Sequence, residues 1–417
     1  MTVSGLASSR PVYVRIYGHC EVRLWGLSSE ERLRRQVQSL PPATVLETGT
    51  EPAAGSTVVL LRADWLYDQR TLQDLLKAPG TLLRVGENGA GAVVAAHVAA
   101  ERVAEVEPLL GRKVRELPPG LEVKTPASLS SAYVQKLLKA ERPIVSRIQP
   151  DKKALLERYL FDGSYKGITD LVTKWVWPAP ARMVVRVCVA LGIRPNGVTL
   201  TSLVLVFAVL WLFDHAWFAS GLLLAWIMTF LDTVDGKLAR VTLDSSPLGH
   251  ALDKGIDLIH PPLWYIAWGA GAIHATLSDA PPWLMVNSVI ILGGYIGGRL
   301  LEGAFDFYLG KFPIYSWRPL DSFARLIIAR RNPNLLLLSA AWIAGRPEVG
   351  LTAVAGWTVI STIFLVFRVA VAAYRRMNHG PLKSWLQQSA TESTPSFASR
   401  TFASSAPSLA QALESSG

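Results

Sequence analysis

The chain has 417 residues, of which 50% are hydrophobic and 18% are charged, and its formal net charge is +10. Its mean hydropathy is +0.28. These values exclude an ordinary soluble protein and a disordered chain, and they favour a membrane-embedded domain. The basic excess points to an anionic membrane surface or phosphate-bearing substrates before nucleic acid, which we do not expect as a partner. Cys20 and Cys188 are too few for a disulfide framework, and no signal peptide is recognisable at the start of the sequence.

Residues 1–145 alternate β-rich runs with helical patterns. Strands are expected over 12–16, 57–61 and 92–96, and helices over 30–40, 71–77 and 101–110. Such alternation predicts a cytosolic α/β domain with a mainly parallel sheet.

The next segment, residues 146–194, is expected to be a linker with interfacial amphipathic helices. Residues 181–193 mix two arginines with apolar side chains. This pattern suits a helix lying at the membrane surface, although a soluble amphipathic helix has the same pattern.

Residues 195–378 hold stretches without Asp, Glu, Lys or Arg at 196–213, 217–231, 258–278, 280–298, 332–345 and 349–367. Most reach the length that crosses a bilayer, which predicts a polytopic all-α bundle of about six helices, with 332–345 the shortest. Lys and Arg concentrate on alternate loops. This bias predicts a multi-pass protein of the inner, cytoplasmic membrane with both termini and the active site facing the cytoplasm. The Ser-, Ala- and Thr-rich residues 379–417 predict a disordered tail.

Four aspartates flank the turn between the second and third expected spans. On a helix, Asp232 and Asp235 lie roughly 60° apart and Asp253 and Asp257 roughly 40° apart, so each pair projects from one face. Two antiparallel helices can therefore direct all four carboxylates into one pocket. Such a cluster resists ionisation unless a cation lies within it, and oxygen ligands alone favour Mg²⁺ or Mn²⁺.

Small residues accompany the carboxylates at helical spacing. Gly236 follows Asp232 by four residues, Ala239 follows Asp235 by four, and Gly249 precedes Asp253 by four. They leave room for a ligand to approach the backbone. Helix capping explains one Asp per helix end but not two spaced pairs, and ionisable groups at membrane depth indicate function.

The aspartates and small residues described above make the sequence from roughly 155 to 378 resemble the CDP-alcohol phosphatidyltransferase family. The pattern Asp232-x2-Asp235-Gly236-x2-Ala239-Arg240-x8-Gly249-x3-Asp253-x3-Asp257 matches that family's signature at every defined position. Residues 194–199 also look like the entry to its first membrane helix.

The resemblance implies a membrane enzyme that transfers a substituted phosphoryl group from a CDP-linked donor, such as CDP-diacylglycerol, to an alcohol and releases CMP. It implies a two-metal centre of Mg²⁺ or Mn²⁺ held by Asp232, Asp235 and Asp253, with Asp257 as general base and as a further possible ligand. It also implies a homodimer and a CDP-donor pocket lined by Asp232 together with Asn196, Thr199, Gly236, Ala239, Arg240 and Gly249.

An acceptor that carries its own phosphate needs cations near the carboxylates. Arg299 follows the fourth uncharged stretch and is the first candidate, ahead of the loop arginines Arg318, Arg325, Arg330 and Arg331. Inositol phosphate, glycerol phosphate and a free alcohol all remain open as acceptors. So does a soluble donor such as CDP-inositol in a bifunctional synthase.

The N-terminal domain resembles a sugar-nucleotidyltransferase-type domain in the segments 23–35 and 61–68, where Asp64 is a candidate metal ligand. The Gly-rich basic loop that cradles a triphosphate is absent after the first strand, and residues 86–91 do not replace it, so a degenerate domain is expected.

Two other functions of the whole chain are considered. A cation-coupled transporter is disfavoured because the aspartates lie near the ends of the spans. An inactive scaffold is disfavoured because all four motif carboxylates are present.

Overall fold

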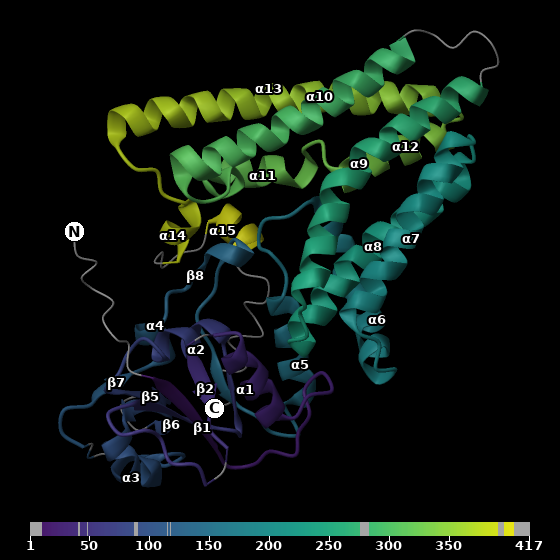
Figure 1. Ribbon diagram of the computed structural model, residues 1–417. Coiled ribbons are helices and arrows are strands. Elements are labelled where there is room, and N and C mark those ends of the chain that lie inside the picture. Colours follow the sequence, from purple (N-terminus) through teal and green to yellow (C-terminus); the bar gives the residue numbers. More distant parts are fainter. Residues whose placement is uncertain are drawn as a thin grey trace, which may run out of the picture. The chain divides into compact units, whose positions relative to one another are not determined.

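The computed structural model describes residues 11–40, 42–47, 49–86, 91–114, 116, 118–275, 283–390 and 396–403. The chain divides into two compact units (Figure 1). Unit 1 comprises Met1–Val134, Glu141–Gly163 and Ala406–Gly417, and unit 2 comprises Gln135–Ala140 and Ser164–Ser405.

Unit 1 is built on a six-stranded sheet with the order β2-β1-β3-β6-β5-β7. Within the described ranges, three pairings are parallel, whereas β6 is antiparallel to both β3 and β5. The connection from β5 to β6 is too short for the crossover that parallel strands require, so the sheet is mixed rather than mainly parallel. The strands are β1 (Val12–Tyr17), β2 (Ala43–Val45), β3 (Thr57–Arg62), β4 (Trp65–Tyr67), β5 (Thr81–Val85), β6 (Ala92–Ala99), β7 (Glu122–Lys124), β8 (Tyr133–Val134) and β10 (Val145–Arg147).

Both faces of this sheet are covered. In β3, Val59 and Leu61 pack with residues of α1 and α2, whereas Val58 and Leu60 pack with residues of α3 on the other face. A strand buried on both faces reads as a continuous apolar run, which is why 57–61 was recognisable in the sequence. The helices of this unit are α1 (Ser29–Gln38), α2 (Gln69–Leu75), α3 (Val103–Val106), α4 (Pro126–Leu129) and α5 (Lys153–Gly163), with 3₁₀ turns η1 (Ala100–Arg102) and η2 (Glu107–Leu109).

Unit 2 is a helical bundle. In it α7 packs against α8 and α9, α10 packs against α13, and α12 packs against α8 and α13. Its elements are η3 (Gln135–Leu137), β9 (Lys139–Ala140), η4 (Val172–Val176), α6 (Pro178–Ala190), α7 (Pro195–Asp214), α8 (Phe218–Thr242), α9 (Pro247–Ala275), α10 (Trp283–Ala304), η5 (Phe305–Gly310), η6 (Ile314–Ser316), α11 (Pro319–Ile327), α12 (Arg331–Ile343), α13 (Pro347–His379), α14 (Trp385–Ser389) and α15 (Phe397–Phe402).

Four helical stretches of the described chain are long and apolar enough to cross a membrane: Pro195–Asp214, Phe218–Thr242, Trp283–Gly310 and Pro347–His379. The predicted fold class, an α/β domain followed by a helical membrane bundle, is thereby confirmed. The other two expected spans correspond to α9, which is long but contains His260, Pro261 and Pro262, and to α12, which has only 13 residues. At 1.5 Å per residue, α12 is too short for a full span.

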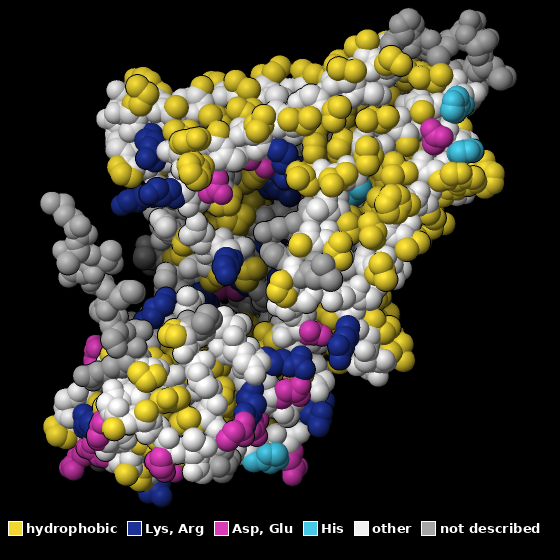
Figure 2. Space-filling model, in the orientation of Figure 1, with side chains coloured by type: hydrophobic (Ala, Val, Ile, Leu, Met, Phe, Trp, Pro, Cys, Tyr) yellow, Lys and Arg dark blue, Asp and Glu magenta, His cyan; other side chains and the backbone are white. Residues whose placement is uncertain are grey.

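The outer faces of these helices are apolar. Along α7 the exposed side chains Leu200, Val204, Phe207 and Trp211 recur at helical spacing and form one stripe. Figure 2 shows hydrophobic side chains covering much of the surface of α7, α9, α10 and α13. An exposed apolar surface of this extent suits contact with lipid.

The C-terminal segment differs from its expected disorder. Residues 385–389 and 397–402 are helical, and the side chains of Leu386 and Phe402 are fully buried. Trp385 donates a hydrogen bond from Nε1 to Ser322 Oγ at 2.9 Å. The few buried apolar side chains that hold this segment could not be recognised from its composition. Residues 391–395 and 404–417 of the predicted tail lie outside the residues that the structure describes.

Candidate active site

Three helix ends meet at the carboxylates. Asp232 and Asp235 lie in the C-terminal half of α8, Asp257 lies early in α9, and α7 begins at Pro195. Leu243 ends α8 in a left-handed conformation, with φ 51°, so that the chain can turn back into α9 within a few residues. A short turn joins the two aspartate-bearing helices, and α7 packs against both of them.

Asp235 is held by the first helix of the bundle. Its Oδ2 accepts a hydrogen bond from Thr199 Oγ1 at 2.8 Å, and its side chain is buried, with 4% of the residue exposed. The same hydroxyl contacts the Pro195 carbonyl oxygen, 3.2 Å away, which fixes its direction. Thr199, which the family resemblance placed near the donor pocket, therefore contacts one of the predicted metal ligands.

Arg331 joins the two aspartate-bearing helices. From the first residue of α12, its guanidinium donates to Asp257 Oδ1 at 2.8 Å and also pairs with Asp232 Oδ2. Asp232 and Asp257 therefore converge on a single cationic group. From the sequence, Arg331 was interpreted as a loop arginine that marks topology or binds the acceptor. Only its position directly before the shortest uncharged stretch, residues 332–345, could have indicated that it begins a helix beside the aspartates.

Asn196 lies against the start of α9. Its amide exchanges hydrogen bonds with Ser246 Oγ, at 3.1 and 3.2 Å, and Ser246 accepts from the Gly249 N–H at 2.9 Å. A Cβ on Gly249 would lie 2.4 Å from Asn196 Oδ1, so any larger residue here would displace the Asn196 side chain. Two residues that the resemblance assigned to the donor pocket are thus in direct contact.

The remaining motif residues line one side of α8. Arg240 Nη1 donates to the Ser164 carbonyl at 3.3 Å, and the neighbouring Lys237 Nζ donates to the same carbonyl at 3.2 Å. A Cβ on Gly236 would meet only Arg240 Nη1, at 3.7 Å, so that position has free space beside it. Ala239 is partly buried one turn before the end of the helix.

The side chains that the structure describes do not include a complete set of metal ligands at the motif carboxylates. No three Asp, Glu, His or Cys residues converge within that part of the structure. The backbone of Asp253 lies in α9, but its side chain is not among those described. The four-carboxylate metal centre thus stays a prediction, and the pairing of Asp232 and Asp257 around one cation is the observation that fits it.

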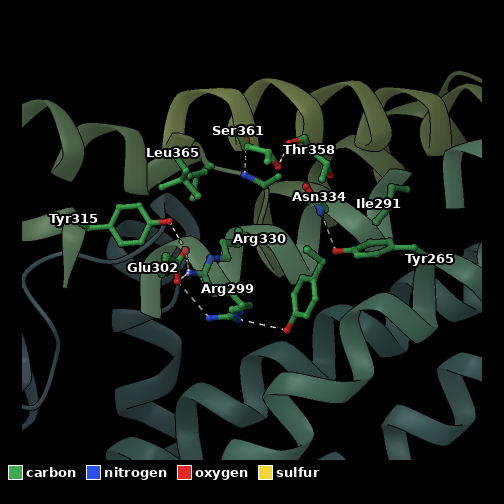
Figure 3. Close-up of a pocket in the computed structure, with 16 residues that line it drawn as sticks. Tyr265, Ile291, Arg299, Glu302, Tyr315, Arg330, Asn334, Thr358, Ser361 and Leu365 are labelled. Carbon is green, nitrogen blue, oxygen red and sulfur yellow. Dashed lines mark hydrogen bonds and ion pairs between the residues drawn. The ribbon is translucent and has the colours of Figure 1, made fainter. Parts of the chain in front are cut away.

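Arg299 lines a small cavity between α9, α10, α12 and α13 (Figure 3). Glu302 lies between Arg299 and Arg330, 3.8 Å from the first and in a tight ion pair with the second. Tyr315 also donates to Glu302, at 2.5 Å. The cavity has a volume of about 30 Å³, enough for a water molecule or two, because Glu302 occupies the space between the arginines.

The arginines predicted to bind the acceptor phosphate do not all line one cavity. Arg325 does not line the Arg299 cavity, and its guanidinium lies 5.6 Å from the centre of the Tyr315 ring. Arg318 lines a different pocket, near the end of α13. Arg330, which ranked behind Arg299 in the sequence, lines the cavity together with it.

In unit 1, Asp64 does not form a metal site with other described acids. Its carboxylate pairs with Arg62 at 2.8 Å and lies 3.7 Å from Arg147. Both arginines neutralise it, so the predicted metal role finds no supporting ligand among the described side chains.

Comparison with known proteins identifies the site-bearing segment. Residues 193–305 match the family model of CDP-alcohol phosphatidyltransferases. Cholinephosphotransferase 1 of Rattus norvegicus is 33% identical over 138 residues, which are 30% of this chain and 31% of the rat protein. Choline/ethanolaminephosphotransferase 2 of Arabidopsis thaliana is 50% identical over 56 residues, 13% of this chain and 14% of that protein. The chain therefore spans less than a third of the length of these curated relatives.

Among solved structures, the manganese- and citrate-bound crystal structure of Mycobacterium tuberculosis phosphatidylinositol phosphate synthase is 21% identical, with a TM-score of 0.35. The match covers 46% of this chain and 88% of that one. The apo form of the same enzyme gives 19% identity and a TM-score of 0.34. The aspartates, glycines and arginine of the motif all lie inside residues 193–305, the segment of this chain that matches the CDP-alcohol phosphatidyltransferase family model.

Proposed function

We propose that this protein is a membrane-embedded transferase that moves a substituted phosphoryl group from a CDP-linked donor to an alcohol and releases CMP. The observation that carries the proposal is the convergence of Asp232 and Asp257, from consecutive helices, on one cationic group. The contact between Thr199 and Asp235 adds a third motif carboxylate at the same helix ends.

The carboxylates suit a divalent cation. Asp232, Asp235, Asp253 and Asp257 would hold Mg²⁺ or Mn²⁺, in two sites by resemblance to the family. When bound, such ions neutralise the donor pyrophosphate and the departing CMP. Arg331 would have to release at least one of its two carboxylates for this to occur.

The chain's own groups account for the proton and for positioning. Asp257 has an exposed side chain fraction of 47%, so an acceptor hydroxyl can reach it. In the proposed step Asp257 takes the proton of that hydroxyl, the acceptor oxygen bonds to the transferred phosphorus, and the bond from that phosphorus to the CMP oxygen breaks. Gly236, with free space beside it, and Asn196, Ala239, Arg240 and Gly249 would line the CDP pocket.

The acceptor would enter beside Arg299 and Arg330. Two guanidiniums around one carboxylate, Glu302, form a site that an anionic group can occupy if Glu302 turns away. This arrangement supports a phosphorylated acceptor such as inositol phosphate or glycerol phosphate. Arg299→Ala is expected to raise the apparent KM for that acceptor without changing donor binding.

The test is CMP release by the purified full-length protein. The donors are CDP-diacylglycerol, CDP-inositol, CDP-choline and CDP-ethanolamine, the last two because the curated relatives are named for choline and ethanolamine phosphate transfer. Each is combined with inositol phosphate, glycerol phosphate, inositol and diacylglycerol. We expect CMP only with a matching pair and only with Mg²⁺ or Mn²⁺.

Asp257→Asn separates catalysis from binding. This variant is expected to retain donor binding, measured by protection of the protein against thermal unfolding, while losing CMP release by several orders of magnitude. The matched control Asp244→Asn changes an aspartate in the adjoining turn and should leave turnover unchanged. Full activity of Asp257→Asn, or CMP release in the presence of a chelator, would contradict the proposed mechanism.

A further inference from the structure

A second pocket lies where α13 ends and the chain turns into α14. It is lined by Trp317, Arg318, Arg375, His379, Gly380, Pro381, Leu382, Lys383, Trp385 and Gln388, and we call it the α13–α14 pocket. Its volume is about 230 Å³, several times that of the cavity beside Arg299. None of these residues belongs to the aspartate motif, so the pocket is separate from the proposed active site.

The lining is strongly basic. Arg318, Arg375 and Lys383 are exposed, His379 accompanies them, and no acidic residue lines the pocket. Asp321, three residues after Arg318, is already neutralised by Arg368, which donates to both of its carboxylate oxygens at 2.6 and 2.9 Å. Within the described residues, no ion pair with Arg318, Arg375 or Lys383 is found, so their charge is available to a ligand. Figure 2 shows basic side chains gathered where α13 runs into α14.

The turn that carries these cations is firmly held. Ser384 is fully buried and donates to the Ser316 carbonyl at 2.8 Å, and Trp385 is anchored to Ser322 Oγ. Gly380, with φ +81°, allows the chain to leave α13 and reverse. The backbone on both sides of Lys383 is therefore fixed, which places the cations around the pocket before any ligand arrives.

The pocket lies at the level where α13 leaves its apolar section. Ile363, Val366 and Phe367 are exposed on α13, and Arg375 and His379 follow about two to three turns after Phe367, next to the exposed Tyr374 and Met377. A change from exposed apolar to basic side chains along one helix marks the boundary between lipid tails and headgroups. Basic pockets at such a boundary suit phosphate-bearing lipid headgroups.

We infer that the α13–α14 pocket binds the phosphate headgroup of an anionic phospholipid at a site distinct from the active site. The shared chemistry is a phosphate anion held by Arg318, Arg375 and Lys383, and the position beside exposed apolar residues of α13 favours the lipid over a free phosphate. This binding does not depend on the proposed transferase activity.

The experiment measures binding of fluorescent phosphatidylglycerol and phosphatidylcholine to the full-length protein in a neutral detergent. We expect phosphatidylglycerol to bind more tightly, and Lys383→Gln or Arg375→Gln to weaken it about fivefold each, the change expected from losing one cation at a charged lipid surface. Lys383→Arg keeps the charge and should retain binding. The matched control Arg346→Gln removes an exposed cation at the other end of α13 and should change the affinity less than twofold.

Three outcomes would overturn the inference. Equal binding of the two lipids, which both carry a phosphate, would remove the selectivity for a headgroup with net negative charge. An equal loss of affinity in Arg346→Gln would show that the effect depends only on the net charge of the protein. Complete displacement of phosphatidylglycerol by millimolar inorganic phosphate would assign the pocket to a free anion. Thermal unfolding of each variant confirms that it is folded, and neither Lys383 nor Arg375 belongs to the proposed catalytic residues, so CMP release in detergent should persist.

Discussion

At the scale of single residues, the two glycines of the motif have different surroundings. Gly249 is closed in by Asn196 and Ser246, whereas Gly236 has open space beside it. The sequence pattern treated both as room for a ligand. Only a structure could separate the glycine that permits helix packing from the one that leaves space.

This difference predicts opposite phenotypes for two alanine substitutions. Gly249→Ala displaces the exposed Asn196 side chain from Ser246 and is expected to cost about 0.5–1.5 kcal/mol of stability, the usual contribution of a lost hydrogen bond. Gly236→Ala should leave the melting temperature unchanged but weaken CDP-donor binding. Differential scanning fluorimetry of both variants, with and without donor, checks this pair. A stable Gly249→Ala variant would contradict the close approach seen here.

Arg331 competes with any metal for two carboxylates. In Arg331→Gln, Asp232 and Asp257 lose their cationic partner and repel each other. We therefore expect this variant to be less stable than the parent without metal and to gain more stability from Mn²⁺. Melting temperatures over a Mn²⁺ titration measure the effect, and Arg346→Gln, which changes a remote arginine, is the control. An equal gain in all three proteins would exclude competition between Arg331 and the ion.

The residue-scale predictions from sequence depended on spacing. Helical periodicity placed Asp232 with Asp235 and Asp253 with Asp257 on shared faces, and the short turn between the helices suggested that the two pairs meet. Thr199 was assigned to the donor pocket by family resemblance alone, and its contact with Asp235 comes from the structure. Periodicity was not sufficient for the pairs of Arg331 with Asp257 and Asp232, which are 74 and 99 residues apart, or for the pair of Glu302 with Arg330, which are 28 residues apart. Long-range ion pairs leave no periodic signal.

At the scale of elements, β6 carries a buried histidine with two fixed partners. His97 Nδ1 lies 2.8 Å from the Leu75 carbonyl oxygen and Nε2 lies 2.9 Å from Thr57 Oγ1. The Leu75 carbonyl oxygen can only accept, so Nδ1 must carry the proton. Nε2 can then accept a hydrogen bond from the Thr57 hydroxyl, and both contacts are satisfied by the neutral imidazole. Burial lowers the pKa of His97 below its ordinary value of 6.5.

The lowered pKa of His97 predicts that unit 1 becomes less stable as the pH falls. The unfolded histidine gains its proton near pH 6.5, while the folded one resists it, so the stability due to the neutral ring is complete above pH 6.5 and is lost as the pH falls through the folded pKa. The protection factors of the β6 amides in the full-length protein, which correct exchange rates for the pH dependence of intrinsic exchange, should fall below pH 6.5. His97→Gln should abolish this fall and His215→Gln, at an exposed site, should not. Unchanged protection factors of the parent protein at pH 5 would contradict the assignment.

Elements were predicted well where their pattern was continuous. The apolar stretches became α7, α8, α10 and α13, and the strand pattern over 57–61 became β3. The α14 and α15 helices were missed because each has five or six residues, and their stability comes from burying Trp385, Leu386 and Phe402 against the bundle rather than from helix propensity.

At the scale of the whole molecule, orientation in the membrane stays a prediction from the distribution of Lys and Arg. The turn at residues 214–216 contains neither, whereas the α8–α9 turn follows Lys237 and Arg240. In a protein without Cys20 and Cys188, His215→Cys should react with a membrane-impermeant maleimide in intact cells. Ser245→Cys should react only after lysis. The reverse pattern would place the aspartates on the opposite side.

The ion pairs of Arg331 have a consequence for how the bundle is assembled. Two helices that bring like charges together inside a bilayer would ordinarily depend on an external counter-ion to associate. Here the counter-ion is part of the polypeptide and arrives with a later helix. The bundle can thus assemble before any divalent ion binds, and binding of the proposed ion would replace one positive group with another.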